Sequence, residues 1–70
     1  MTFYKWVNSL EIINSPEGDL VFDIQHDTKF PKSVNSLADL LDYLPDDERI
    51  QETAKSLFES YLAEIRHHSE

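Results

Sequence analysis

Acidic side chains show the most regular spacing of any chemically active group in this sequence. Asp19, Asp23 and Asp27 recur at every fourth position, which places three carboxylates along one face if the segment is helical. Such a row could bind a cation or imitate the charge of a nucleic-acid backbone, but a solvated helix face has the same pattern. Calcium needs about six oxygen ligands from a folded loop, and the sequence has no DxDxDG loop. We therefore expect a solvated acidic face, opposite the apolar stripe of the same helix.

The three histidines give weak signals for catalysis or metal binding. His26 lies between the acidic residues and Phe30, but a general base needs a nucleophile or a substrate pocket nearby, and no motif supplies one. Glu64 and His67 form a Glu-x-x-His pair, followed by His68, and such a pair is one component of helical metal sites. The second pair is missing from the sequence. We therefore predict no catalytic, cofactor-binding or metal-binding residue.

The composition removes most of the remaining enzyme classes. The absence of cysteine excludes disulfides, thiolate zinc sites and cysteine nucleophiles. A single glycine gives no Gly-rich loop that could bring backbone amides against a phosphate, and neither an HExxH motif nor a nucleophile turn with triad partners occurs. The sequence predicts a protein that is not an enzyme and uses no cofactor.

The charge balance argues against direct nucleic-acid binding. Six Lys and Arg residues against fourteen Asp and Glu residues give a formal net charge of −8. Only Lys29 and Lys32 lie close together, whereas binding to a phosphate backbone needs clustered cations that displace counterions. A surface this acidic repels DNA. The same charge would suit an acidic decoy that occupies the basic groove of a DNA-binding protein.

Length and patterning predict one helical domain. Seventy residues, of which 40% are hydrophobic, can build one core, so we assign a single domain to residues 1–70. No run approaches the ~18 apolar residues of a membrane span, and the first residues lack the apolar segment and cleavage site of a signal peptide. We expect a soluble, cytoplasmic protein without membrane contact. No stretch alternates apolar and polar residues as a half-buried strand does, so the sequence predicts an all-α bundle of four main helices.

The first helix is expected over about residues 2–10, where apolar side chains recur at helical spacing. One short helix cannot bury all of its aromatic residues equally. We therefore expect Tyr4 and Trp6 to reach the surface, and any exposed apolar patch to lie around them. The remaining aromatic residues are expected in the core rather than on a base-stacking platform. In the following loop, Ile12 and Ile13 are expected to fill the core.

A second helix is expected to begin at Ser15-Pro16-Glu17. Serine caps a helix, proline fits its first turn, and an acidic residue favours the positive end of the helix dipole. Gly18 in this first turn should weaken the helix start, since glycine has a low helix propensity. The helix must end before Phe30-Pro31, because a residue that precedes proline is pushed out of the helical conformation.

Two further helices follow. The third begins at Ser33 or Ser36, and Asp39, three residues after Ser36, favours the second choice. The last covers about residues 46–66, with acidic residues in its first turn and unbroken helical periodicity. We expect five apolar residues to be buried together: Phe30, Leu37, Leu40, Leu57 and Tyr61.

Four short motifs, in order along the chain, resemble a known family. They are Phe3-Tyr4-x-Trp6-Val7, Asp27-Thr28-Lys29-Phe30-Pro31-Lys32, Tyr43-Leu44 and Phe58-x-x-Tyr61. On these motifs the chain resembles the YozE-type, sterile-alpha-motif-like family of short bacterial proteins, found mainly in Firmicutes. Phe58 stands where this family usually has Trp, and Ala54 stands where Phe is common. The resemblance implies a small bundle of four to five helices, but no activity and no binding residues.

The sequence supports two main functional hypotheses. The first is a non-catalytic protein-interaction module whose surface, predicted to include Tyr4, Trp6, Asp19, Asp23 and Asp27, docks another protein. The second is an acidic regulator that mimics nucleic acid and occupies a DNA-binding protein. Direct nucleic-acid binding ranks third because the charge opposes it. An apolar patch with a polar rim would favour docking, whereas one contiguous acidic stripe would favour mimicry.

Overall fold

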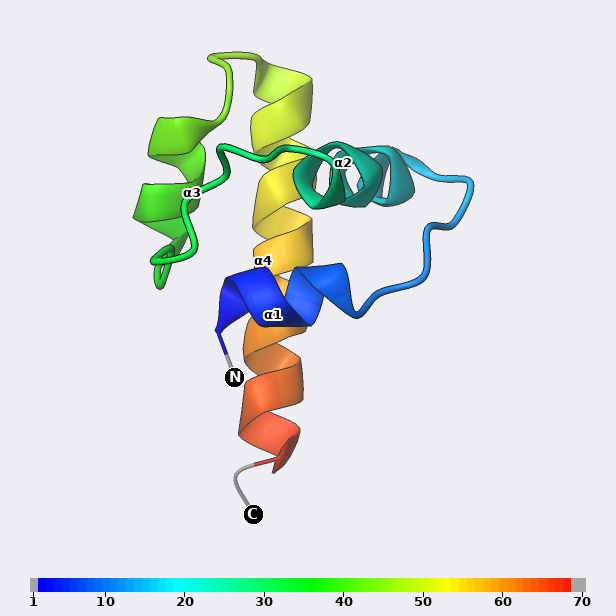
Figure 1. Ribbon diagram of the computed structural model, residues 1–70, viewed down its shortest axis with the longest axis vertical. Helices are drawn as coiled ribbons and strands as arrows, with labels where there is room; N and C mark the ends of the chain where they lie inside the picture. Colours follow the sequence, from blue (N-terminus) through cyan, green and yellow to red (C-terminus); the bar gives the residue numbers. More distant parts are fainter. Residues whose placement is uncertain (1, 69–70) are drawn as a thin grey trace.

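Four helices make up the structure, a computed structural model that describes residues 2–68. They are α1 (Phe3–Asn8), α2 (Pro16–Gln25), α3 (Leu37–Tyr43) and α4 (Glu48–His68), and no strand is present in this range. The long α4 runs the length of the molecule, α1 and α2 cross it, and α3 packs beside its first half (Figure 1). The predicted all-α bundle is confirmed.

Hydroxyl side chains define where the first three helices begin. In each case a Ser or Thr side chain accepts a hydrogen bond from a backbone N–H three residues later, which satisfies one of the unpaired donors of the first turn. The pairs are Thr2 with Lys5 (3.1 Å), Ser15 with Gly18 (3.0 Å) and Ser36 with Asp39 (3.2 Å). Of the two caps considered for the third helix, the structure uses Ser36 rather than Ser33.

Two helices differ in length from the expectation. The first ends at Asn8 rather than at residue 10, because the backbone N–H of Ser9 turns back to the Trp6 carbonyl oxygen (3.0 Å) and ends the helix. The last begins at Glu48 rather than at residue 46. Asp47 accepts hydrogen bonds there from the backbone N–H groups of Arg49 (2.9 Å) and Ile50 (3.4 Å), so it acts as the cap of this helix.

The core is an aromatic cluster built around Phe3. This ring is fully buried, and its centroid lies 5.2 Å from that of Phe58 and 5.3 Å from that of Tyr61 on α4. Trp6 and Phe30 complete the cluster at 5.8 and 6.4 Å. Pairs of rings at these separations add to the stabilisation that burial alone provides. Most aromatic residues therefore pack inside the protein, as the sequence predicts.

Phe30 lies in the corner between α2 and α3. Its side chain is buried, as are those of Leu40, Leu57 and Tyr61, so four of the five side chains expected to be buried together are confirmed. The fifth, Leu37, is only partly buried and packs against the edge of the core.

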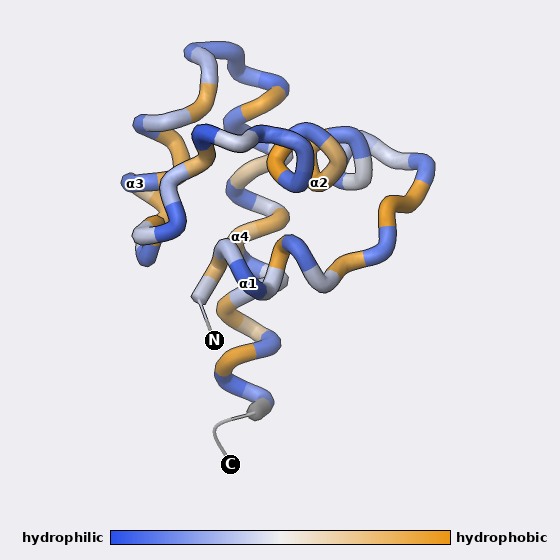
Figure 2. The backbone as a smooth tube through the Cα atoms, viewed as in Figure 1, coloured by the Kyte–Doolittle hydropathy of each residue, from blue (hydrophilic) through white to orange (hydrophobic). Residues whose placement is uncertain are grey.

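The loop between α1 and α2 does not fill the core as expected. Ile12 and Ile13 are 46% and 60% exposed, so the predicted role for them is wrong. The side chain of Gln25 donates hydrogen bonds to the carbonyl oxygens of Val7 (2.9 Å) and Leu10 (3.0 Å), which ties the end of α1 to α2. Beyond this tie the chain swings away from the bundle (Figure 1), and it carries a hydrophobic stretch there (Figure 2).

Gly18 also differs from the expectation. It is buried, and a β-carbon at this position would lie 1.7 Å from the carbonyl oxygen of Ile13. The loop backbone therefore passes directly over the first turn of α2, and only a residue without a side chain allows this approach. Gly18 is a packing requirement of the fold rather than a weak point in the helix.

Candidate functional site

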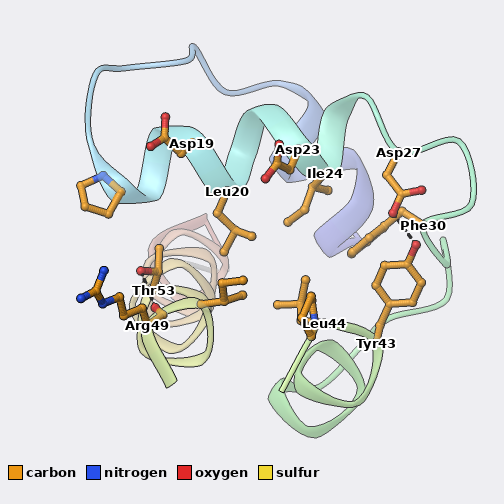
Figure 3. Close-up of a pocket in the computed structure, with 13 residues that line it drawn as sticks. Asp19, Leu20, Asp23, Ile24, Asp27, Phe30, Tyr43, Leu44, Arg49 and Thr53 are labelled. Carbon is orange, nitrogen blue, oxygen red and sulfur yellow. Dashed lines mark hydrogen bonds between the residues drawn. The ribbon is translucent and has the colours of Figure 1, made fainter. Parts of the chain in front are cut away.

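A groove of about 620 Å³ opens between α2 and the wall formed by the end of α3 and the start of α4 (Figure 3). Its floor is apolar and is formed by side chains that project from both sides. Leu20 and Ile24, one turn apart on α2, project toward the groove, Leu44 lies across from them, and Ile50 of α4 adds to the same wall. Phe30 lines the groove at the end where α2 leads into the corner.

The groove keeps apolar surface accessible. Leu20 and Ile24 are buried, but Leu44 and Ile50 are only partly buried and pack against the edge of the core. Covering such surface is favourable by about 25 cal/mol per Å². Concave apolar sites with a few polar groups at the edge are typical binding sites.

One edge of the groove is acidic. Asp19 and Asp23 are exposed on α2 and line the groove next to Leu20 and Ile24 (Figure 3). The expectation that the acidic row lies opposite the apolar stripe is therefore wrong. Each Asp directly precedes an apolar residue, about 100° away on a helix, so the two rows are neighbours. Within residues 2–68, the side chains of Asp19 and Asp23 take part in no hydrogen bond or ion pair.

Asp27 plays a different part from the other two acidic residues. It lies beyond the end of α2, where its Oδ2 accepts a hydrogen bond from the Tyr43 hydroxyl of α3 and its Oδ1 accepts one from the Lys29 backbone N–H (2.9 Å). The Tyr43 ring also packs edge-on against Phe30, with centroids 5.2 Å apart. These contacts close one end of the groove (Figure 3).

The same hydrogen bonds shift two pKa values. The Tyr43 hydroxyl, followed by the Lys29 backbone N–H, lowers the pKa of Asp27 because both stabilise the carboxylate. The pKa of Tyr43 is raised, chiefly because ionisation would break its hydrogen bond to Asp27. The contribution of Asp27 to stability is therefore fully present above its ordinary pKa of 3.8 and is lost as the pH falls through its lowered value.

Tyr43→Phe removes this donor and should raise the pKa of Asp27 toward its ordinary value. The chemical shift of the Asp27 side-chain carboxyl carbon, followed by NMR from pH 2 to pH 7, measures the change. Tyr4→Phe is the matched control, because the Asp27 carboxylate takes its hydroxyl donor from Tyr43 instead. An Asp27 pKa that is the same in the wild type and in Tyr43→Phe would contradict the hydrogen bond.

The other edge of the groove carries Arg49 and Thr53, one turn apart at the start of α4. The Thr53 hydroxyl donates to the Arg49 carbonyl oxygen (2.9 Å), as is common for Thr inside a helix. Arg49 is exposed and places a positive charge across the groove from the acidic edge. The groove thus has an acidic edge, an apolar floor and an opposite edge with a cation and a hydroxyl.

The two aromatic residues predicted at the surface lie elsewhere. Trp6 is 7% exposed and packs 5.4 Å from the Tyr61 ring, so the expectation that it reaches the surface is wrong. Tyr4 is partly exposed, stacks on Phe30 at 6.3 Å, and has the Lys32 ammonium 5.5 Å from its ring centroid. We expected any exposed apolar patch around these two residues, but the accessible apolar surface of the groove lies at other residues.

The histidines are placed apart from the groove. His26 is exposed, stacks on Phe22 with centroids 4.2 Å apart, and hydrogen-bonds the Phe22 carbonyl oxygen through Nδ1 (2.9 Å). His67 is exposed near the end of α4, and the side chain of His68 lies outside the described part. In the part of the chain that the structure describes, no three acidic, His or Cys side chains converge as metal ligands do.

Sequence reasoning missed the far wall of the groove. Leu44 directly follows α3 and Ile50 lies on α4, and the periodicity of each segment marks these positions only as apolar. Tyr43 and Asp27 lie sixteen positions apart on separate elements, and no spacing rule connects them. The one available signal was that each Asp of α2 directly precedes or follows apolar positions, which places it at the boundary of the buried face.

These elements define a small all-helical domain with a sterile-alpha-motif-like fold and one apolar groove edged by acidic residues. The family model described as YozE SAM-like fold matches residues 2–64. The chain therefore belongs to the YozE SAM-like family, and the resemblance read from its motifs is confirmed. Neither a curated protein nor a solved structure matches the chain. Among residues 2–68, no helix combines the length and the apolar character needed to cross a bilayer.

Proposed function

We propose that this protein is a non-catalytic protein-interaction module and that the groove between α2, α3 and α4 is its contact surface. The observation that carries the proposal is an apolar floor left accessible beside the carboxylates of Asp19 and Asp23, which have no partner among residues 2–68. An apolar patch with a polar rim is the arrangement that protein contact surfaces commonly show. We therefore revise the interaction surface predicted from the sequence. Asp19, Asp23 and Asp27 line the groove and stay in it, whereas Tyr4 and Trp6 lie outside the groove lining and leave it.

The protonation chemistry of the groove supports a non-catalytic role. Asp27 and Tyr43 bond to each other, and this bond lowers the pKa of Asp27 and raises the pKa of Tyr43. Both groups therefore keep one protonation state near neutral pH. General acid–base catalysis works best when the pKa lies near the working pH, so this pair is suited to holding α2 against α3 rather than to moving protons.

Ile50→Gln tests the proposal, with Ile65→Gln as its matched control. Both residues lie on α4, but Ile50 lines the groove while Ile65 is exposed outside it. We expect Ile50→Gln to reduce capture of the protein partner from a lysate of the producing cells by about tenfold, since one buried apolar side chain contributes about 1.5–3 kcal/mol. Quantitative mass spectrometry of the captured proteins measures the loss.

The control variant must keep its capture, and circular dichroism must show that both variants fold. Equal capture by Ile50→Gln and Ile65→Gln would contradict the groove as the contact surface. The alternative function, an acidic mimic of nucleic acid, rests on the net charge of −8. It predicts a DNA-binding partner that moderate salt releases, because exposed charges are screened. Capture of that partner should be the same for the wild type and for Ile50→Gln.

A further inference from the structure

We propose that the groove binds a basic, apolar polypeptide segment: one or two large apolar side chains enter the groove, and two Lys or Arg side chains pair with Asp19 and Asp23. This inference rests on the proposed function and specifies its partner. It follows from the shape of the floor, the charge of the α2 edge, and the charge of the whole molecule.

The floor determines the apolar part of the partner. A volume of about 620 Å³ between Leu20 and Ile24 on one side and Leu44 and Ile50 on the other admits a few side chains. A whole helix, about 10 Å across with its side chains, does not fit inside. The partner backbone must therefore lie over the opening while its apolar side chains point inward.

The α2 edge determines the charged part. Asp27 is already bonded to Tyr43 and to the Lys29 backbone, so it is not available as a strong acceptor for a partner. Asp19 and Asp23 are exposed and unpaired within residues 2–68. They lie one turn apart, about 6 Å along the helix axis, which specifies two cations at that separation. Arg49 on the opposite edge repels further cations, so the basic residues must lie on the α2 side.

The net charge determines which molecule can supply this segment. A second copy of the chain also carries −8, and two such copies repel each other. An acidic protein is disfavoured for the same reason. A basic segment is attracted at long range, and at the groove it meets two carboxylates that no other described residue pairs with. Charge complementarity therefore selects a basic segment.

A library of random dodecamer peptides displayed on phage, selected on the immobilised protein, is the probe. Enriched peptides should contain large apolar residues together with at least two Lys or Arg residues. Their affinity is then measured by fluorescence anisotropy on the wild type and on Asp19→Asn/Asp23→Asn. Each exposed ion pair should change the affinity by about two- to fivefold, so the double variant should bind about tenfold more weakly.

Asp42→Asn/Glu59→Gln is the matched control, because it changes the net charge equally at exposed positions of α3 and α4 outside the groove lining. It should weaken binding less than twofold. Enrichment of peptides without basic residues, which still lose binding to Ile50→Gln, would overturn this inference while leaving the proposed function in place. Peptides that bind the wild type and Ile50→Gln equally would overturn both, and a selection that enriches no peptide would overturn the inference.

Discussion

Replacing Phe3 with alanine should lower the free energy of unfolding by about 3–5 kcal/mol, the usual cost of removing a buried aromatic side chain. The Phe3 ring is 0% exposed and contacts rings from α1, α4 and the corner before α3. The cavity left by the missing Phe3 ring cannot close easily, because the rings around it come from separate elements. A core in a chain of this size supplies about 3–5 kcal/mol in total, so most Phe3→Ala molecules should be unfolded at room temperature.

Far-UV circular dichroism during urea unfolding measures this loss. Phe22→Ala is the matched control, since Phe22 is 47% exposed and the same substitution there removes little buried surface. Phe3→Leu keeps much of the apolar volume and should fold, with a smaller loss, so the stability can be measured even if Phe3→Ala is fully unfolded. A Phe3→Ala protein as stable as Phe22→Ala would show that the aromatic cluster is not the centre of the core.

Gly18→Ala should destabilise the protein by about 1–3 kcal/mol, the range for forcing extra atoms into a packed site. Helix propensity alone predicts the opposite sign, a gain of up to about 1 kcal/mol. The close approach decides between them: the new β-carbon would lie 1.7 Å from the Ile13 carbonyl oxygen, and backbone cannot move aside as a flexible side chain can. The shift would also disturb the cap, because the Gly18 N–H donates to Ser15 (3.0 Å).

Thermal unfolding of Gly18→Ala checks the sign directly, and a loss of this size lowers the midpoint by several degrees in a small domain. Glu59→Ala, at an exposed position of α4, shows the small effect of introducing alanine where nothing is displaced. A Gly18→Ala midpoint above that of the wild type would mean that the loop between α1 and α2 is not held against α2.

The groove and the core share residues, so binding and stability are linked. Phe30 packs against Phe3 in the core and also lines the groove. Leu20 and Ile24 likewise are buried core residues that line the groove. A ligand that binds only the folded protein stabilises it by an amount that grows with the logarithm of its concentration relative to its Kd. For the same reason, substitutions at Ile50 are better probes of the groove than substitutions at Phe30, since Ile50 is only partly buried.

The sequence by itself determined the features that depend on neighbouring residues. Ser15-Pro16 predicted the start of α2, Ser36 with Asp39 predicted the start of α3, and unbroken periodicity predicted α4 within two residues at each end. A cap, a proline constraint and a helical stripe each act within a few positions along the chain. The motifs that indicated the family also lay in the sequence, and the match over residues 2–64 confirmed that family.

Only the tertiary structure decided which apolar and acidic residues meet. Trp6 is buried and Ile12 is exposed, although both are large and apolar, because Gln25 holds the end of α1 and the next segment turns outward. The groove lies between α2 on one side and the end of α3 with the start of α4 on the other, and its closure by Tyr43 and Asp27 joins residues sixteen positions apart. Contacts between separate helices depend on how whole elements pack against each other, and periodicity within one element carries no information about that arrangement.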